Sequence, residues 1–442
     1  MKVVPKNTPI NHDVVKNRIE NLGVAEIGKS TIRELVRLVN EIEKETGEKF
    51  VRMEMGVPGL NPPQVGINAE IEALKRGVAS KYPMIEGVAE LKVEISRFVK
   101  NFLDIDTPAR CCVPSVGSMQ GSYAVFLVAN RSDKTKEGTL FIDPGFPVQK
   151  QQIRVMGHDY MSFDVYNYRG EKLRDKLESY LKTGKVSSIL YSNPNNPSWI
   201  CFTETELKII GELATKYDAV VIEDLAYFGM DFRKDYSKPG VAPYQPTVAK
   251  YTDNYVLLIS SSKAFSYAGQ RVGCIAVSEK LYDRHFPDLK RFYSSDSFGY
   301  SLIYGALYAL SSGVCHSAQF GLAAMLKAAN DGGFNFVEDV KIYGERAATM
   351  KRLLVENGFH IVYDRDEDEQ LADGFYFTFA YKDMSGAELL EKLIYYGISA
   401  ISLSITGSER TEGLRACVSQ TSPTQFADFE KRLKQFNSDF GN

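Results

Sequence analysis

The reactive side chains of this sequence follow apolar segments that it predicts as strands. Segment 255–260 leads into Lys263, and segment 219–223 leads into Asp224, with Tyr227 three residues later. A lysine amine can form a Schiff base with an aldehyde, and an aspartate can hold a heterocyclic nitrogen in its protonated form. A tyrosine hydroxyl can donate a hydrogen bond to a phenolate oxygen. This combination predicts chemistry on a heterocycle that carries an aldehyde.

A second group of residues is suited to binding. Gly117, Ser118 and Met119 open an apolar helical run, and a helix that begins with small residues presents free N–H groups and its positive dipole end to an anion. Arg271, eight residues after the lysine, is a second candidate for that anion. Phe146 follows another predicted strand and offers an aromatic face for stacking. Together, the two groups meet the needs of pyridoxal phosphate, an electron sink held by a lysine and an acid.

These residues are far apart in the sequence, so the fold must bring them together. Short apolar segments are separated by helical or loop sequence, at about 139–142, 187–191, 219–223, 255–260 and 272–277. Such alternation predicts βαβ units and a mostly parallel sheet. Ligands of open parallel sheets bind outside the carboxyl ends of the strands. We therefore expect the reactive residues to meet at one edge of the sheet.

The chain length and texture predict two domains. A chain of 442 residues is long enough for two to three. We expect residues 1–55 to form an N-terminal segment of a smaller domain, 56–320 a large cofactor-binding domain, and 321–442 the rest of the smaller domain. The predicted fold class is α/β: a large domain with a mostly parallel central sheet flanked by helices, and a smaller α+β domain.

Composition excludes several classes of function. With 53 Lys and Arg against 56 Asp and Glu, the formal charge of -3 gives no electrostatic case for nucleic acid or an anionic membrane as a partner. The longest apolar stretches are far shorter than the roughly 18 residues of a membrane span. The N-terminus lacks the apolar run of a signal peptide, and the six cysteines show no spacing typical of a metal site. We expect a soluble, cytoplasmic protein without a metal.

The motifs resemble those of the class I/II, fold-type I pyridoxal-phosphate aminotransferases, the group around aspartate aminotransferase. The resemblance extends over about residues 55–419. Ser260-Ser-Ser-Lys263, followed by Arg271, is similar to the Ser-x-x-Lys box of that family with its arginine. Asp224-x-x-Tyr227 is similar to the acid–phenol pair that contacts the ring nitrogen and the 3′ oxygen of the cofactor.

The resemblance implies a role for each matching residue. The catalytic residues would be Lys263, Asp224 and Tyr227. The cofactor site would consist of Gly117, Ser118, Met119, Phe146, Asn196, Asp224, Tyr227, Ser260, Ser262, Lys263 and Arg271. A homodimer is implied as well, because Tyr82 resembles the tyrosine that reaches the phosphate of the neighbouring subunit. The substrate would contact Gly56, Asn196 and Arg415, whose guanidinium would hold the α-carboxylate.

The implied activity is that of a transaminase. It would move the amino group from an L-amino acid to a 2-oxo acid through a Schiff base on Lys263, with ping-pong kinetics. The resemblance also suggests glutamate as one substrate; Arg291 is a candidate for its distal carboxylate, or else a surface arginine. One departure stands out: the chain reads Asn196-Pro-Ser-Trp199 where the family often has Asn-Pro-Thr-Gly. This departure leaves the path of the loop open and places Trp199 near the expected cofactor site.

Other activities on the same residues stay open. A β- or γ-lyase, a decarboxylase or a cyclopropane synthase would share Lys263 and Asp224, and Arg415 is compatible with each of them. A regulator with an aminotransferase-like domain would need a DNA-binding module, and residues 1–50 show no clear helix-turn-helix. A nicotinamide dehydrogenase would need a G-x-G-x-x-G motif, which the sequence lacks. Amino-group transfer is the favoured interpretation.

Overall fold

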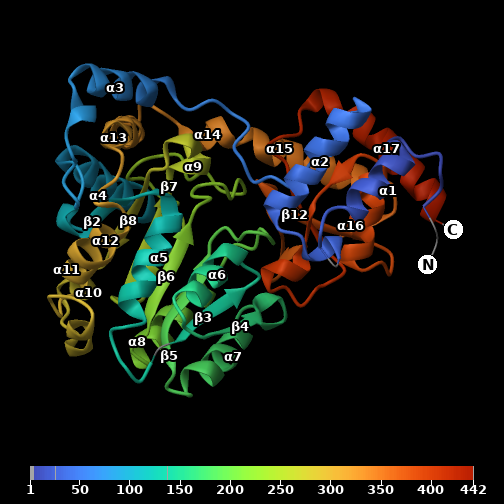
Figure 1. Ribbon diagram of the computed structural model, residues 1–442. Helices are drawn as coiled ribbons and strands as arrows, with labels where there is room; N and C mark the ends of the chain where they lie inside the picture. Colours follow the sequence, from blue (N-terminus) through green and yellow to red (C-terminus); the bar gives the residue numbers. More distant parts are fainter. Residues whose placement is uncertain (1–3, 25, 137, 442) are drawn as a thin grey trace. The chain divides into compact units, whose positions relative to one another are not determined.

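The computed structural model describes residues 4–24, 26–136 and 138–441 and contains two compact units (Figure 1). The first unit consists of Met1–Gly59, Asn196–Ile200 and Lys341–Asn442, and the second of Leu60–Asn195 and Cys201–Val340. These bounds differ from the expected domain bounds at 55/56 and 320/321. The larger difference arises because a single helix, α13 (His316–Asn330), continues across position 320 and packs on helices of the second unit.

A seven-stranded sheet forms the centre of the second unit. Its strands, in spatial order, are β2 (Cys112–Ser115), β8 (Gly273–Val277), β7 (Tyr255–Ser260), β6 (Val220–Leu225), β5 (Val186–Ser192), β3 (Gly138–Asp143) and β4 (Tyr160–Asp164). The strands from β7 to β4 run parallel, whereas β8 runs antiparallel to both β2 and β7. The predicted α/β class with a mostly parallel sheet is therefore confirmed, and the five predicted strands match to within two residues at each end.

Complete burial of the inner strands explains why they read as apolar runs. Every residue of β5, β6 and β7 is buried, as expected for a parallel sheet covered on both faces. Helix α5 (Gly117–Ala129) lies across β5 to β8 (Figure 1). Its Phe126 belongs to one hydrophobic core with Phe141, Leu258 and Ile275 of the sheet. The sheet and α5 thus form the rigid support of the residues at the strand ends.

Eleven further helices of the described part of the second unit surround the sheet. They are α3 (Gln64–Lys75), α4 (Ala89–Leu103), α6 (Pro147–Val155), α7 (Lys172–Leu181), α8 (Glu204–Lys216), α9 (Ser261–Ala264), α10 (Glu279–Asp283), α11 (Phe298–Tyr300), α12 (Tyr308–Ser311), α13 (His316–Asn330) and α14 (Phe336–Val340). A π-helical segment, Ser301–Leu307, joins α11 to α12. Among the described residues, we find no helix with the length and apolar character that crossing a membrane requires.

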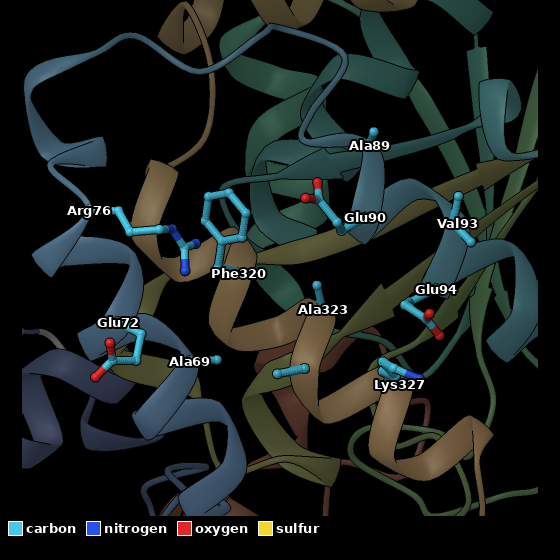
Figure 2. A pocket seen from close by; sticks show the side chains of 11 residues that line it. Ala69, Glu72, Arg76, Ala89, Glu90, Val93, Glu94, Phe320, Ala323 and Lys327 are labelled. Atoms are coloured by element: carbon cyan, nitrogen blue, oxygen red, sulfur yellow. The ribbon is translucent and has the colours of Figure 1, made fainter.

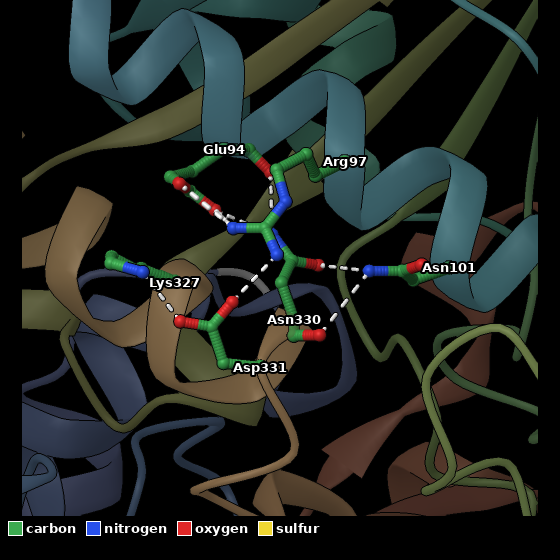
Figure 3. Close-up of polar contacts among 6 residues, drawn as sticks. All are labelled: Glu94, Arg97, Asn101, Lys327, Asn330 and Asp331. Carbon is green, nitrogen blue, oxygen red and sulfur yellow. Dashed lines mark hydrogen bonds and ion pairs between the residues drawn. The ribbon is translucent and has the colours of Figure 1, made fainter.

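A polar network ties α4 to the end of α13 (Figure 3). Asn330 donates from Nδ2 to the backbone oxygen of Glu94, at 3.0 Å, and to its carboxylate, at 2.9 Å, while Asn330 Oδ1 accepts a bond from Asn101. Arg97 bridges Glu94 and Asp331. Because Glu94 and Asn330 are buried, their bonds replace the water that both groups lose on folding.

The described residues of the first unit form a four-stranded sheet and five helices. The sheet has the order β14 (Ile401–Ser402), β15 (Leu414–Cys417), β12 (Tyr376–Tyr381) and β9 (Phe359–Ile361), all antiparallel. Two strand pairs stand apart from it, namely β1 (Val51–Arg52) with β13 (Ile398–Ser399) and β10 (Arg365–Asp366) with β11 (Glu369–Gln370). The helices are α1 (His12–Glu20), α2 (Ile32–Thr46), α15 (Ile342–Glu356), α16 (Gly386–Tyr395) and α17 (Phe426–Phe440).

The network in Figure 3 predicts unequal effects of two substitutions on the stability of the protein. Asn330→Ala leaves the buried Glu94 carboxylate short of a donor, so we expect the free energy of unfolding to fall by about 2 kcal/mol. Lys327→Ala removes an exposed ion pair with Asp331 and should cost less than about 1 kcal/mol. Urea denaturation of the two variants measures the difference, and equal losses would contradict this account.

Candidate functional site

The predicted catalytic residues of the second unit lie at the carboxyl edge of its sheet. Asp224, near the end of β6, pairs in register with Leu258 of the neighbouring parallel strand β7. Strand β7 ends at Ser260, and Lys263 follows in the short helix α9, half-buried. Asp224 therefore lies near the end of one strand and Lys263 follows the end of the adjacent one, at the edge where open parallel sheets bind their ligands.

The Asp224 carboxylate is buried, with 6% of the residue exposed. Its Oδ2 accepts a hydrogen bond from the Gln149 side-chain amide at 2.9 Å, and its Oδ1 accepts one from the backbone N–H of Ala226 at 3.2 Å. Burial raises the pKa of Asp224 to about 6, although these two bonds act in the opposite direction. Both donors are neutral, so the ionised carboxylate carries a desolvation cost that they offset only in part.

Helix α6 supplies two residues to the same edge. Phe146 precedes its first residue and is half-buried, and Gln149, in its first turn, is the donor to Asp224. Lys150, the next residue, forms a buried ion pair with Asp143 at the end of β3. Burial raises the pKa of Asp143 to about 6, against the effect of Lys150. Sequence reasoning named Phe146 but missed Gln149. The signal that could have pointed to Gln149 was its position three residues after Phe146, on the same side of the helix.

The start of α5 and the side chain of Arg271 lie close together at the same edge of the sheet, an arrangement suited to an anion that we call the anion cradle. Gly117, at φ +65°, begins α5, and a Cβ there would come within 2.7 Å of Nη2 of Arg271. Gly273 pairs with both Ser115 and Ser260, and a Cβ on it would lie 3.2 Å from the Ser118 nitrogen. No side chain caps the N-terminus of α5. The helix start and the guanidinium thus approach each other closely, and side chains at the two glycines would obstruct this approach.

The remaining predicted residues of the second unit occupy nearby positions. Ser260 caps α9, because its hydroxyl accepts the N–H of Ser262 at 3.1 Å. Tyr227 is buried three residues after Asp224, just beyond the end of β6. Ser118 and Met119 lie in the first turn of α5 and are half-buried.

Arg415 is the centre of a second cluster, which lies in the first unit. The residue is 3% exposed, its Nη2 donates to the backbone oxygen of Glu54, and its Nε has no hydrogen-bond partner among the described residues. The guanidinium carbon lies 4.6 Å from the centroid of the Tyr376 ring. Gly56 belongs to the same cluster, since a Cβ on it would lie 2.1 Å from the Tyr376 hydroxyl. A buried guanidinium with an unused N–H is suited to a carboxylate.

The loop with the family departure also belongs to the first unit. Asn196 is buried there, and Trp199 is buried completely. The backbone of Trp199 has φ +67°, the left-handed conformation that glycine adopts freely and other residues adopt at a cost of roughly 1–2 kcal/mol. The loop therefore keeps a conformation typical of glycine although tryptophan replaces it.

Two further predicted residues of the second unit, Tyr82 and Arg291, are exposed. Tyr82 follows α3 and is 91% exposed. Arg291 lies on the surface, where its Nε donates to the backbone oxygen of Asp288 at 3.1 Å and pairs with the carboxylate of that residue at 3.7 Å. This local pairing favours the surface interpretation of Arg291.

A cavity of about 590 Å³ lies elsewhere in the second unit, between α3, α4 and α13 (Figure 2). Small or apolar side chains line it together with the charged side chains of Glu72, Arg76, Glu90, Glu94 and Lys327. Arg76 lies over the Phe320 ring at 5.0 Å. None of the predicted site residues contributes to its lining. The chemistry of the strand ends therefore does not involve this cavity.

Comparison with known proteins identifies the family of this chain. The family model for aminotransferase class I and II matches residues 48–433. A probable aspartate aminotransferase from Methanocaldococcus jannaschii is 22% identical over 415 residues, which cover 92% of this chain and 96% of that protein. The predicted family is therefore confirmed.

Solved structures share the fold. An aspartate aminotransferase from Thermotoga maritima matches with a TM-score of 0.75 at 19% identity, covering 95% of this chain and 99% of that one. An alanine aminotransferase from Pyrococcus furiosus matches with a TM-score of 0.75 at 18% identity, covering 96% and 99%. These matches confirm the predicted fold-type I architecture. Because the family model covers residues 48–433, which is most of its length, this chain belongs to the class I and II aminotransferases and is a transaminase.

Proposed function

We propose that this transaminase uses pyridoxal phosphate, bound to Lys263, to move the amino group of an L-amino acid to a 2-oxo acid with ping-pong kinetics. The observation that carries the proposal lies at one edge of the second-unit sheet. There the buried Asp224 lies near the end of one strand, Lys263 follows the adjacent strand, and Arg271 approaches the start of α5. When bound, pyridoxal phosphate supplies an electron sink for the bonding electrons of the substrate α-carbon.

The donor set at this edge fits the cofactor ring. A buried carboxylate served only by neutral donors gains from a cationic partner, and Asp224 has this character. A protonated ring nitrogen would provide the positive charge, and Asp224 would keep that nitrogen protonated. Phe146 offers a ring for stacking, while Tyr227 and Asn196 are suited to the phenolic oxygen.

The anion cradle fits the phosphate group. Uncapped N–H groups at the start of α5 and the guanidinium of Arg271 attract the same dianion. Ser118, Met119, Ser260 and Ser262 would complete this binding site. These groups move no proton in the reaction; they fix the cofactor so that Lys263 acts on a defined position.

Lys263 and Arg415 would act on the substrate. Arg415 would bind the α-carboxylate, using the Nε–H that has no partner among the described residues, and Gly56 and Asn196 would contact the substrate beside it. Once released from the cofactor, the Lys263 Nζ would take the proton from the substrate α-carbon and deliver it to the C4′ carbon of the cofactor. A second 2-oxo acid would bind to the same arginine and run the reaction in reverse, which is the basis of the ping-pong pattern.

A homodimer is part of the proposal. Tyr82, which would reach the phosphate of the partner subunit, is 91% exposed in the single chain. The neighbouring segment also exposes apolar side chains, including Ile71, Leu74 and Met84. Exposed apolar side chains around a residue with a proposed role support an interface at this position.

The absorption spectrum tests the covalent bond. Wild-type protein with added pyridoxal phosphate should show the visible band of the lysine-bound cofactor, and borohydride should fix the cofactor to the chain. Lys263→Ala should lack both and lose activity by about 10²–10⁴-fold, because it loses its proton carrier. Lys280→Ala, which removes an exposed lysine paired with Asp253, is the control. Ammonia or carbon dioxide release without transfer to 2-oxoglutarate would instead indicate a lyase or decarboxylase.

The pH dependence of stability tests the role of Asp224. Because its folded pKa is raised to about 6, the cofactor-free protein should lose stability as the pH rises from about 4 to 6 and stay at the lower value above that. Asp224→Asn removes the buried charge, so at pH 8 we expect this variant to exceed the wild type by on the order of 2–3 kcal/mol, with no difference at pH 4. Thermal unfolding measures both.

Added pyridoxal phosphate should reverse the order at pH 8, since it stabilises the wild type more than the variant. Asp159→Asn, at an exposed position, controls for the loss of a charge. If Asp224→Asn were the less stable variant without cofactor, a desolvated aspartate would not explain the site.

Purified hybrid dimers test the position of Tyr82. Tyr82→Ala and Lys263→Ala chains, co-expressed with different tags, should each be impaired as homodimers when cofactor is limiting. The hybrid should recover about half of the wild-type activity, because a two-fold dimer with crossed tyrosines keeps one intact site of two. If Tyr82 served its own subunit, neither site of the hybrid would be intact and no recovery would be seen.

A further inference from the structure

Trp199 is the single tryptophan of the chain, and it stands where the family often has glycine. Its backbone is left-handed and its side chain is fully buried in the first unit. A large residue in a conformation suited to glycine persists only where the surroundings hold it. The contacts of the indole therefore indicate what it is for.

Gly374 makes room for the indole. A Cβ at position 374 would lie 2.1 Å from Cε2 of Trp199, 2.2 Å from Cζ2 and 2.3 Å from Nε1. These distances are far shorter than van der Waals contact, so the indole packs directly against the backbone of Gly374. The absence of a side chain at 374 thus accommodates the bulk of the one at 199.

From Gly374 the contacts lead to Arg415. Tyr376, two residues on, is the first residue of β12, and its ring lies edge-on to the indole with centroids 6.2 Å apart. Tyr376 pairs with Cys417 and Thr378 with Arg415, which puts Tyr376 and Arg415 diagonally on one face of the sheet. The Arg415 guanidinium lies over the ring of Tyr376 at 4.6 Å.

We propose that Trp199 is a positioning residue for the carboxylate-binding arginine. The indole, seated on Gly374, fixes the Tyr376 ring; the ring and the backbone oxygen of Glu54 together hold the guanidinium so that its Nε–H edge faces the substrate carboxylate. This inference rests on the proposed function, in which Arg415 binds that carboxylate.

Substitution of Trp199 is expected to weaken substrate binding rather than slow the chemical step. Amino and 2-oxo acids share the α-carboxylate, and its contact with Arg415 has the same strength before and during the reaction. A loss of such uniform binding raises KM and leaves kcat nearly unchanged. Trp199 should therefore affect the KM of both substrates in parallel.

Substitutions of Trp199 in the holoenzyme test the proposal. We expect Trp199→Gly and Trp199→Leu to raise KM for both substrates about tenfold with kcat within about threefold, since a desolvated cation–ring contact accounts for a change of this size. Trp199→Phe should restore most of the binding because it keeps a ring against Tyr376. Gly374→Ala should act like Trp199→Gly by displacing the indole. Tyr396→Phe, which alters a buried tyrosine bonded to Asp439, is the control.

Tryptophan emission gives a readout that is independent of turnover. In the cofactor-free full chain, succinate, a carboxylate that cannot be transaminated, should change the emission of Trp199 along a saturable curve that matches its binding by calorimetry. Arg415→Lys should abolish this response. Emission that stays constant while calorimetry shows succinate bound would overturn the positioning role, even if the Trp199 variants failed to fold.

The outcomes separate the two proposals. If Arg415→Lys raises KM whereas folded Trp199→Gly or Trp199→Leu does not, the carboxylate site stands and the positioning role is wrong. Normal KM values for Arg415→Lys would overturn the carboxylate site itself, and the inference with it. A loss of kcat alone in the Trp199 variants would also contradict the inference.

Discussion

The buried carboxylate of Asp224 is the interaction on which the site depends. It lies in a covered sheet, accepts hydrogen bonds from two neutral donors, and has a raised pKa because water is excluded. An isolated charge in such a place is unfavourable unless a partner of opposite charge arrives. The fold tolerates this cost because β5, β6 and β7 fix the strand on which the aspartate lies. A cationic heterocycle would be held there because it removes the cost.

The reversal of one strand completes the site around this charge. Strand β8 runs antiparallel to β7, so the chain returns to the same edge and places Arg271 beside the start of α5. A sixth parallel strand would begin at the opposite edge, away from Lys263. Glycines at 117 and 273 then permit the close approach of helix, strand and guanidinium. The mixed sheet is thus what brings cation, lysine and aspartate to a single edge.

The sequence predicts the inner strands well and the outer ones poorly, for a physical reason. Buried parallel strands read as apolar runs, so β5, β6 and β7 were expected. The two edge strands were not: β2 has four residues, with Pro114 among them, and β4 begins with half-buried residues. An edge strand can accommodate proline and polar residues because one side of it has no neighbour. Such a strand gives no clear signal in a single sequence.

The residues of the site likewise divide into those that the sequence predicts and those that it does not. Lys263, Asp224 and Arg271 were proposed as site residues because they lie in short motifs near predicted strands, which local spacing in the sequence reveals. The contact of Tyr376 with Arg415 depends on strand register over a separation of 39 residues, which no local pattern records. Contacts of this kind become visible only once the chain is folded.

The exchange at Trp199 and Gly374 shows how a departure from a family motif can be accommodated. The backbone at Trp199, in the turn after Asn196, is left-handed, and glycine adopts this conformation more easily than tryptophan does. The added bulk is taken up 175 positions later, where glycine leaves the space that the indole fills. Because Tyr376 is only two residues after Gly374, the packing of Trp199 against Gly374 also affects the position of the Tyr376 ring, over which the Arg415 guanidinium lies. If Arg415 binds the substrate carboxylate as proposed, a change in the loop after Asn196 would thereby be coupled to substrate binding.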